Sequence, residues 1–276
     1  MGALRPSHPW GCRIRAGSRM IRRIDPDYLR ATAQTPAVRA LKTRGHELLQ
    51  IQAGDTVVDV GCGPGIDTIE LARLVGPGGA VVGIDGDLHM IEQANRLATA
   101  AGVGAIARHV VGNATYINLG SESADAVYCE RVLQHVTWPG TYEVGREIQR
   151  ILKSGGRLVI IDTDWASLSV ASPDPWLERR IVAEHVLGFA NPFSGRQLPA
   201  LLANLAVSNR IFETYNLPLS FDAVEFLLRP AIQRGIAAGR ISTAEGAQWW
   251  HGLGVGRDYG LFFAHVSMVL AAARKI

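Results

Sequence analysis

The stretch Val57-Val58-Asp59-Val60-Gly61-Cys62-Gly63-Pro64-Gly65 decides the fold of this chain. Its first four residues are mostly apolar and β-branched, which predicts a short buried strand. Three glycines at alternate positions then predict a tight turn, and apolar residues at helical spacing predict a helix over 66–75. In such a unit the backbone can approach a ligand closely, and the N–H groups of the helix point at it. The stretch therefore indicates a site for a nucleotide-like ligand.

The composition is that of a globular protein with a basic arm. The chain has 276 residues, of which 47% are hydrophobic and 19% are charged, enough for one large core. Its net charge of +3 is misleading, because residues 1–23 hold six arginines and no acid, which leaves 22 basic and 25 acidic residues in the remainder. We expect 1–23 to be a flexible arm, or a leader upstream of a start at Met20, and 24–276 to be the functional domain. A nucleic-acid partner for the arm is the less favoured alternative, and the slightly acidic domain lacks the basic surface of a nucleic-acid enzyme.

Targeting and cysteine patterns point to the cytoplasm. The arm has no apolar core of a signal peptide, and no later run is long and apolar enough to span a membrane. Cys12, Cys62 and Cys129 are too few and too scattered for a disulfide framework or a zinc site. We therefore expect a cytoplasmic protein without a metal site.

Strands and helices alternate along most of the chain. After helices within 24–50, we predict helices over 66–75, 87–101 and 138–152, and strands over 56–60, 80–84, 106–111, 125–129 and 157–162. This alternation predicts an α/β fold with a doubly wound, mostly parallel sheet whose ligand lies beyond the carboxyl ends of the strands.

The last third of the chain is expected to choose the substrate. We predict lid or substrate elements over 163–205 and 222–256 and a sixth strand over 209–216. The seventh strand, over 262–272, is expected to be antiparallel and to lie at the edge of the sheet. Trp249, Trp250 and His251 are interpreted as core or lid packing residues, although they could also line an apolar substrate.

Acidic residues distinguish between the ligands that such a loop could bind. Asp85 ends the second strand about 20 residues after the glycine turn, where a carboxylate accepts hydrogen bonds from a ribose diol. A dinucleotide site would need glycine at position 66, which is Ile66. Asp59 would repel a pyrophosphate but suits the ammonium and sulfonium groups of a cationic ligand.

At this point the sequence resembles a known family, the class I S-adenosylmethionine-dependent methyltransferases, in the small-molecule branch that includes ubiquinone and menaquinone biosynthesis. The resemblance covers about residues 30–165. It rests on the glycine stretch together with residues 83–90 (Gly-Ile-Asp-Gly-Asp-Leu-His-Met), 112–114 (Gly-Asn-Ala), 123–127 (Ser-Ala-Asp-Ala-Val), 132–136 (Val-Leu-Gln-His-Val) and 152–158 (Leu-Lys-Ser-Gly-Gly-Arg-Leu).

The resemblance implies S-adenosylmethionine as cofactor, S-adenosylhomocysteine as product, and a secondary-metabolite or quinone-like acceptor methylated at O, N or C. Asp85 would bind the ribose and Met90 would pack on the adenine. Asn113 departs from the family's usual aspartate; its amide oxygen can still accept a bond from the adenine, or it is simply a turn residue. The cofactor-binding residues implied in this way are Asp59, Gly61, Cys62, Gly63, Asp85, Gly86, Met90, Asn113, Ala114, Glu130 and Arg131.

Methyl transfer from a sulfonium is an in-line displacement, so the protein contributes mainly alignment. A hydroxyl or acidic carbon acceptor also needs a base, and His135 is the first candidate. Asp162 or Asp164 could orient His135 or act as the base alone. His135 could instead pack beneath the site, and an amine acceptor needs no strong base. The candidate substrate contacts are Tyr28, Trp165, Asn191, Phe193 and Arg196.

Two other functions stay open at this stage. The same fold hosts cyclases that bind the cofactor without transferring its methyl group, and regulatory proteins that have lost the transfer activity. Assembly into a homo-oligomer is also left open by the sequence.

Overall fold

The computed structural model describes residues 33–276, so the predicted arm and the candidate Tyr28 lie outside the described residues. The described chain forms a seven-stranded sheet in the order β3-β2-β1-β4-β5-β7-β6. Strands β1 to β5 pair in parallel, and β7 runs antiparallel to both of its neighbours. This confirms the predicted fold class. The strands are β1 (Thr56–Val60), β2 (Ala80–Asp85), β3 (Ala107–Val111), β4 (Ala124–Glu130), β5 (Leu152–Val170), β6 (Val207–Pro218) and β7 (Ala264–Lys275).

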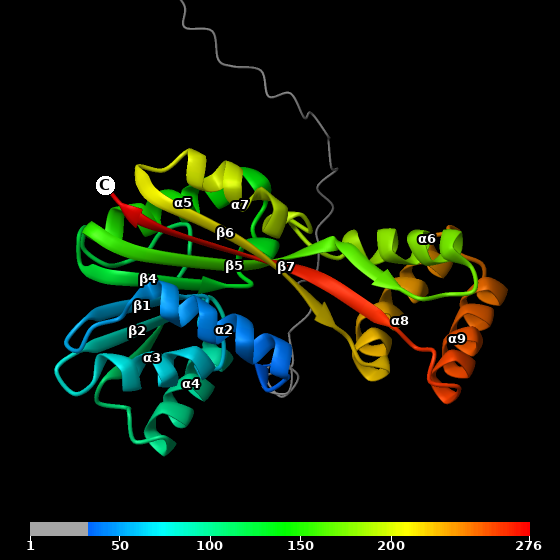
Figure 1. The fold of residues 1–276 in the computed structure, drawn as a ribbon, viewed down its shortest axis with the longest axis horizontal. Coiled ribbons are helices and arrows are strands. Elements are labelled where there is room, and N and C mark those ends of the chain that lie inside the picture. Colours follow the sequence, from blue (N-terminus) through cyan, green and yellow to red (C-terminus); the bar gives the residue numbers. More distant parts are fainter. Residues whose placement is uncertain (1–32) are drawn as a thin grey trace, which may run out of the picture.

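Helices cover both faces of the sheet (Figure 1). One face carries α2 (Pro36–Leu49), α3 (Ile66–Val75) and α4 (Leu88–Ala100), and the other carries α5 (Trp138–Ile151) and α7 (Ser194–Ala203). Each face has its own apolar core, because side chains of a strand alternate between the two sides. Asp59, Tyr128 and Glu130 therefore share the α2–α3 face, whereas Asp162 belongs to the α5–α7 face.

Local chemistry explains where these helices begin. Pro36 occupies the first turn of α2, where its missing N–H costs nothing. The Asp87 side chain caps α4 by accepting a hydrogen bond from the N–H of His89. Gly65 precedes α3 with a φ of 82°, a backbone conformation that favours glycine. The predicted helix over 66–75 is thus confirmed with its boundaries.

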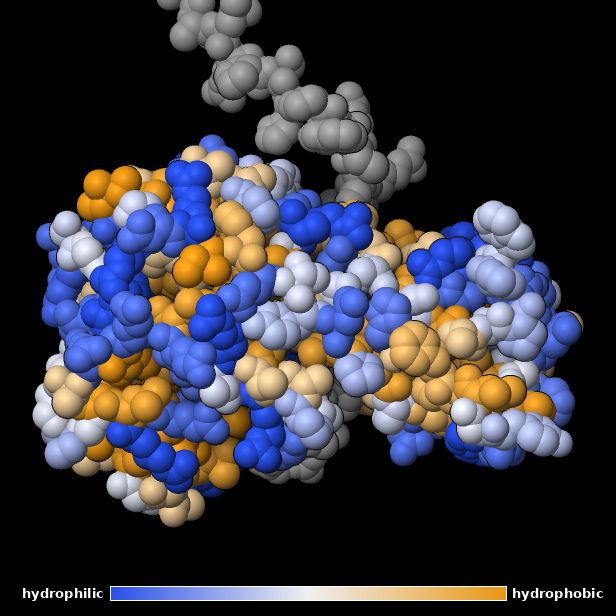
Figure 2. Space-filling view, in the orientation of Figure 1, coloured by the Kyte–Doolittle hydropathy of each residue, from blue (hydrophilic) through white to orange (hydrophobic). Residues whose placement is uncertain are grey.

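The long strands β5, β6 and β7 continue beyond the ends of the other four strands and carry a second group of helices (Figure 1). We call these helices, together with the strand ends beside them, the extension: α6 (Pro175–Val186), α8 (Phe221–Ala237) and α9 (Thr243–Asp258). The α2–α3 core continues into it through Ile181, Leu228 and Trp249, which are all buried. Apolar side chains also reach the surface of the extension (Figure 2). Leu261 and Phe263, which precede β7 in the chain, are exposed.

Two sequence predictions need correction. The last strand, β7, is not at the edge of the sheet: it lies between β5 and β6, and β6 is the edge strand. Most β6 side chains are exposed, whereas β7 is largely buried, as an inner strand must be. The predicted strand over 157–162 is only the middle of β5, because antiparallel pairing with β7 continues as far as Val170.

The predicted insertion over 163–205 divides between two places. Its first residues continue β5 and its next helix, α6, belongs to the extension, whereas α7 packs on the core sheet. Among residues 33–276, no helix combines the length and apolar character needed to cross a membrane.

Candidate active site

The glycine loop after β1 lies directly against two neighbouring segments. The N–H groups of Gly61 and Cys62 both donate to the carbonyl of Ile84, at 2.7 and 3.0 Å. Gly61 has a φ of 75°, and a Cβ added there would lie 2.1 Å from Cγ2 of Val132. A side chain at position 61 would therefore collide with the segment that follows β4, and glycine keeps the loop closed against it.

Asp85 connects this loop to the end of β2. Its Oδ2 accepts a hydrogen bond from the N–H of Gly63, and its Oδ1 accepts one from the N–H of Asp87, both at 2.9 Å. Gly86 is exposed beside it, and Met90 is buried in the first turn of α4. The carboxylate is thereby placed next to the loop, and we expect the ribose diol to bind there.

The turn after β3 gives less support to the adenine contact that the family resemblance implies for Asn113. Asn113 is exposed, and its Oδ1 accepts hydrogen bonds from the N–H and the hydroxyl of Thr115, each at 2.9 Å. Ala114 is half-buried in the same turn. The interpretation of Asn113 as a turn residue thus has direct support, and its contact with adenine stays a prediction.

A cluster of buried and half-buried polar side chains lies on the α2–α3 face. We call it the Lys42 cluster: Lys42, Asp67, Tyr128, Glu130 and Arg131. The ammonium group of Lys42 lies 2.5 Å from a carboxylate oxygen of Asp67 and of Glu130. Tyr128 donates to Glu130 at 2.7 Å, and Nε of Arg131 lies 3.0 Å from its other oxygen. Burial alone would raise the pKa of Glu130, but Lys42 and Arg131 outweigh it and lower the pKa to about 2.

Asp59 faces the same side but has no comparable partner. It is 2% exposed, and its Oδ2 has no hydrogen-bond partner. Burial first, and then the neighbouring charge of Asp67, raise the pKa of Asp59 well above its usual range. A buried, unpartnered carboxylate beside the glycine loop is complementary to a cationic ligand, so these residues fit the ammonium and sulfonium groups of the implied cofactor.

Asp162, a candidate catalytic residue, accepts four hydrogen bonds from neighbouring protein groups. Its Oδ2 accepts from the N–H groups of Leu133 and Gln134, at 2.7 and 3.3 Å, and its Oδ1 accepts from Thr163 and Ser194, at 2.8 and 2.9 Å. Burial raises the pKa of Asp162 to about 6, although the four donors favour the ionised form. The carboxylate is fully buried and anchors the start of the short helix η1 (Leu133–His135).

His135, the other catalytic candidate, ends η1 and is exposed. Surrounding protein nevertheless lowers the pKa of His135, so the ring is neutral near pH 7. Its ring centroid lies 6.5 Å from that of Phe189, which stacks on Trp165 with centroids 4.8 Å apart. The ring of His185 contacts both, at 5.2 and 4.9 Å. We call Trp165, His185 and Phe189 the aromatic cluster.

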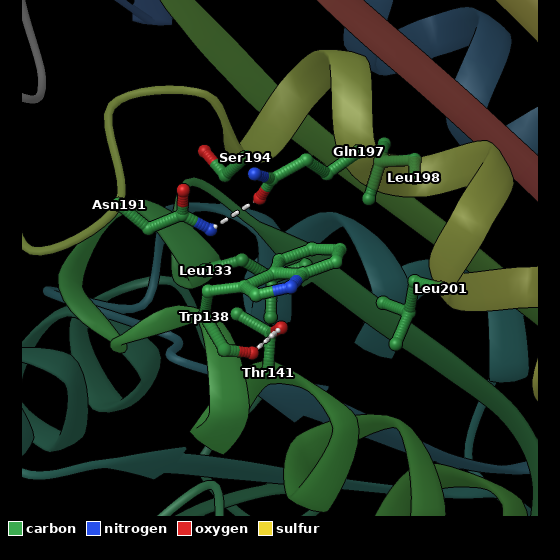
Figure 3. A pocket seen from close by; sticks show the side chains of 8 residues that line it. All are labelled: Leu133, Trp138, Thr141, Asn191, Ser194, Gln197, Leu198 and Leu201. Atoms are coloured by element: carbon green, nitrogen blue, oxygen red, sulfur yellow. Dashed lines mark hydrogen bonds between the residues drawn. The ribbon is translucent and has the colours of Figure 1, made fainter. Parts of the chain in front are cut away.

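The remaining substrate candidates lie next to this cluster, but their side chains are engaged. Asn191 is buried, and its amide nitrogen donates to Oε1 of Gln197 at 2.8 Å (Figure 3). Arg196 is ion-paired with Asp164 at 2.7 Å, and its guanidinium lies 5.5 Å from the ring centroid of Phe193. These contacts hold the loop before α7 in place.

A small cavity lies behind Asn191, between α5 and α7 (Figure 3). It has no room for even a water molecule, whereas ligand pockets typically measure roughly 300–1,000 Å³. We therefore interpret it as a packing gap. It is lined by Leu133, Trp138, Thr141, Asn191, Ser194, Gln197, Leu198 and Leu201.

Sequence reasoning missed Lys42 and Gln134. Lys42 lies on the buried stripe of α2 with Val38 and Leu41, and a lysine on an apolar stripe is itself a signal of a buried ion pair. Gln134 is buried beside His135, but its role depends on Trp165, which follows 31 residues later in the chain. No local pattern predicts that contact.

The chain is similar in sequence to known methyltransferases. Residues 57–156 match the family model of a methyltransferase domain. An uncharacterised 37.1 kDa protein in transposon Tn4556 of Streptomyces fradiae is 33% identical over 270 residues, 94% of this chain and 75% of that protein. The demethylmenaquinone methyltransferase of Lactobacillus johnsonii is 33% identical over 115 residues, 42% of this chain and 46% of that enzyme, so the match spans about half of the relative.

A solved structure shares the fold. Geranyl diphosphate C-methyltransferase from Streptomyces coelicolor A3(2), in complex with Mg²⁺, geranyl diphosphate and S-adenosyl-L-homocysteine, superposes with a TM-score of 0.55 at 19% identity. The superposition covers 86% of this chain and 80% of that one. The chain belongs to the class I S-adenosylmethionine-dependent methyltransferases. It is thus a methyltransferase, with S-adenosylmethionine as its cofactor.

Proposed function

We propose that this methyltransferase acts on a small, partly apolar acceptor, of quinone-like or natural-product type, that binds beside η1 and the extension. The observation that carries the proposal is the aromatic cluster: Trp165 stacks on Phe189 just beyond the core of the sheet, next to the exposed ring of His135. Aromatic faces bind flat, apolar groups favourably, and this cluster lies at the end of the sheet to which the glycine loop belongs.

The charge pattern favours different ligands at the glycine loop and at the aromatic cluster. Asp67, Asp85 and Glu130 outnumber Lys42 and Arg131 near the loop even without Asp59, whose pKa is raised, and this favours a cationic cofactor there. The aromatic cluster carries no ionised group of its own, because the pKa of His185 is lowered to about 4 by burial. A flat, largely apolar acceptor suits it better than an acidic or basic polymer, and any charged atom of the acceptor would lie outside the cluster.

The bound cofactor supplies an electrophilic methyl group. The chain's own contribution is positional: the glycine loop and Asp85 hold the nucleoside, and η1 presents His135 to the acceptor. Asp162 positions η1 through two backbone hydrogen bonds and takes no proton itself. We further propose a cytoplasmic location, because Cys62 and Cys129 are buried as free thiols.

Two measurements test this function. Titration calorimetry with S-adenosylhomocysteine tests the cofactor site, and absence of binding would overturn the proposal. Incubation with methyl-labelled S-adenosylmethionine tests the acceptor, with a demethylated naphthoquinol and a small-molecule extract of the host as probes. A labelled small molecule is expected, whereas an acceptor that is transformed but unlabelled would favour the cyclase alternative.

Variants connect that activity to the aromatic cluster. Trp165→Ala should weaken turnover of the labelled acceptor at least tenfold while leaving S-adenosylhomocysteine binding intact. Trp176→Ala is the matched control, because Trp176 is in the extension but 82% exposed. Equal loss in both variants, or no loss in either, would contradict an acceptor site at the aromatic cluster.

A further inference from the structure

Gln134 connects the aromatic cluster to His135. Its Oε1 accepts a hydrogen bond from the indole N–H of Trp165 at 2.7 Å, and its amide nitrogen lies 3.1 Å from Nε2 of His135. Gln134 is 5% exposed, so its side chain has these two partners in a dry environment.

The direction of each hydrogen bond follows from chemistry alone. An indole nitrogen can only donate, so the carboxamide atom facing Trp165 must be the oxygen. The atom facing His135 is then the amide NH₂, which also can only donate. Nε2 of His135 must therefore accept, and in a neutral imidazole the proton is then on Nδ1.

Two backbone hydrogen bonds hold Gln134 in place between Asp162 and Asn191. Its N–H donates to Asp162 at 3.3 Å, and its carbonyl accepts from the N–H of Asn191 at 3.0 Å. Rotating the carboxamide by half a turn would place NH₂ against the indole N–H and the oxygen against Nε2. The indole N–H would then face two N–H donors, and His135 could keep its contact only by moving its proton to Nε2, so the indole of Trp165 decides in favour of the assigned orientation.

We propose that Gln134 is a positioning residue that holds His135 as its Nδ1–H tautomer, so that His135 donates a hydrogen bond to an oxygen of the acceptor and does not remove its proton. The proposal rests on the proposed function, whose acceptor site it describes. It refines the role expected for His135 from base to hydrogen-bond donor. The ring of His135 is exposed, which leaves Nδ1–H as the polar group available to a ligand.

This tautomer selects a class of acceptor. An N–H donor stabilises an oxyanion, so the favoured acceptor is a phenolate or an enolate that binds already ionised. In its methylation the bond from sulfur to the methyl carbon breaks as the new bond from oxygen or the conjugated carbon forms. The anion's charge and the sulfonium's charge cancel. An oxygen acceptor then leaves no proton for the protein to take up, whereas a ring carbon that carries hydrogen passes that proton through solvent to the oxygen as the ring becomes aromatic again.

The charged groups around His135 are compatible with a neutral ring. The carboxylate of Asp85 favours a proton on His135, whereas the guanidinium of Arg131 and the surrounding protein oppose it. The opposing effects prevail and lower the pKa of His135. The ring thus carries one proton near neutral pH, and Gln134 decides which nitrogen holds it.

Nitrogen-15 NMR of the full chain with labelled histidine tests the proposal without any turnover. The couplings between ring nitrogens and ring carbon-bound protons distinguish the two neutral tautomers, and His135→Gln assigns the resonances. We expect His135 in the Nδ1–H form, both alone and with S-adenosylhomocysteine. An Nε2–H form in the wild-type protein would overturn the proposal.

Substitutions of Gln134 and Trp165 should change the tautomer of His135 in different, predictable ways. In Gln134→Glu, the carboxylate can only accept, so His135 is expected to switch to the Nε2–H form with a raised pKa. In Trp165→Phe, the carboxamide loses the donor that orients it, and a mixture of tautomers is expected. An unchanged His135 spectrum in both variants would refute the role of Gln134, and Gln134→Met provides a second check should Gln134→Glu fail to fold.

The chain offers a matched control on α4. The amide nitrogen of Gln93 also lies 3.1 Å from Nε2 of His89, but this pair is exposed. Gln93→Glu should change the His89 resonances and leave those of His135 unchanged. Since S-adenosylhomocysteine binding is measured separately, failure of the tautomer assignment and failure of the methyltransferase proposal give different results.

Discussion

Asp85 accepts a hydrogen bond from the backbone N–H of Gly63 at 2.9 Å, across 22 residues of chain. The acid at the end of β2 and the loop at the end of β1 are thus one unit before any ligand is present. A carboxylate that already orients the loop is preorganised for the ribose, because little reorganisation is left when the ligand arrives.

Asp85→Ala should therefore weaken S-adenosylhomocysteine binding for two reasons, loss of the ribose contact and loosening of the loop. Hydrogen bonds to a charged group contribute about 1.5–3 kcal/mol each, which corresponds to a roughly 10- to 100-fold higher Kd. Titration calorimetry measures this change. Asp258→Ala, at an exposed position on α9, is the control, and unaltered affinity in Asp85→Ala would contradict the site.

Gly61→Ala should destabilise the fold more than an ordinary glycine substitution. Its φ of 75° is strained for alanine, and the new Cβ would lie 2.1 Å from Val132. Strain and overpacking together should cost about 2–4 kcal/mol of the free energy of unfolding, measured in urea.

Two further variants separate these causes. Gly54→Ala has a φ of 91° but open space around the new Cβ, so it reports strain alone. The double variant Gly61→Ala, Val132→Ala should recover part of the loss relative to Gly61→Ala. Equal effects of Gly54→Ala and Gly61→Ala would show that contact with Val132 does not matter.

Lys42→Met should leave two buried carboxylates without their shared cation. Side-chain exposures of 8% for Lys42 and 5% for Glu130 place this pair in the interior. Removal of one partner of a buried ion pair costs about 3–5 kcal/mol. Lys153→Met, which breaks the more exposed pair with Asp125, should cost only about 0–1 kcal/mol. Urea unfolding at pH 7 compares the two.

The pH dependence of the same variant has a definite sign. Lys42 and Arg131 lower the pKa of Glu130 to about 2, below its usual 4.5, so the ionised group stabilises the fold above about pH 4.5. This contribution is lost as the pH falls toward 2. The difference between wild type and Lys42→Met should shrink over this range, and a difference that grows on acidification would contradict the assignment.

Cofactor binding should release a proton from Asp59. Burial and the neighbouring Asp67 raise the pKa of Asp59 in the ligand-free protein, and a cationic ligand nearby would lower it. Affinity for S-adenosylmethionine should therefore rise with pH through the raised pKa. Calorimetry in two buffers of different ionisation enthalpy measures the proton release directly, and Asp59→Asn should abolish it. Identical enthalpies in both buffers for the wild type would refute this coupling.

Whether a feature could be predicted from the sequence depends on how far apart in the chain the residues that determine it are. The helix over 66–75 and the turn of Gly61 follow from neighbouring residues, and both were predicted. The position of β7 could not be, because an apolar strand does not specify which neighbours it pairs with. The length of β5 was missed for the same reason, since its last residues are ordered by pairing with β7.

By itself, the sequence determined the glycine loop, Asp85 at the end of β2, and hence the fold class and the cofactor, because these depend on residues close together in the chain and on the two-residue alternation of a strand. Only the tertiary structure decided that Asp162 anchors η1, that Lys42 balances Glu130, and that Gln134 joins Trp165 to His135. Each of these contacts links residues of separate elements, and buried polar atoms must find partners wherever the fold supplies them.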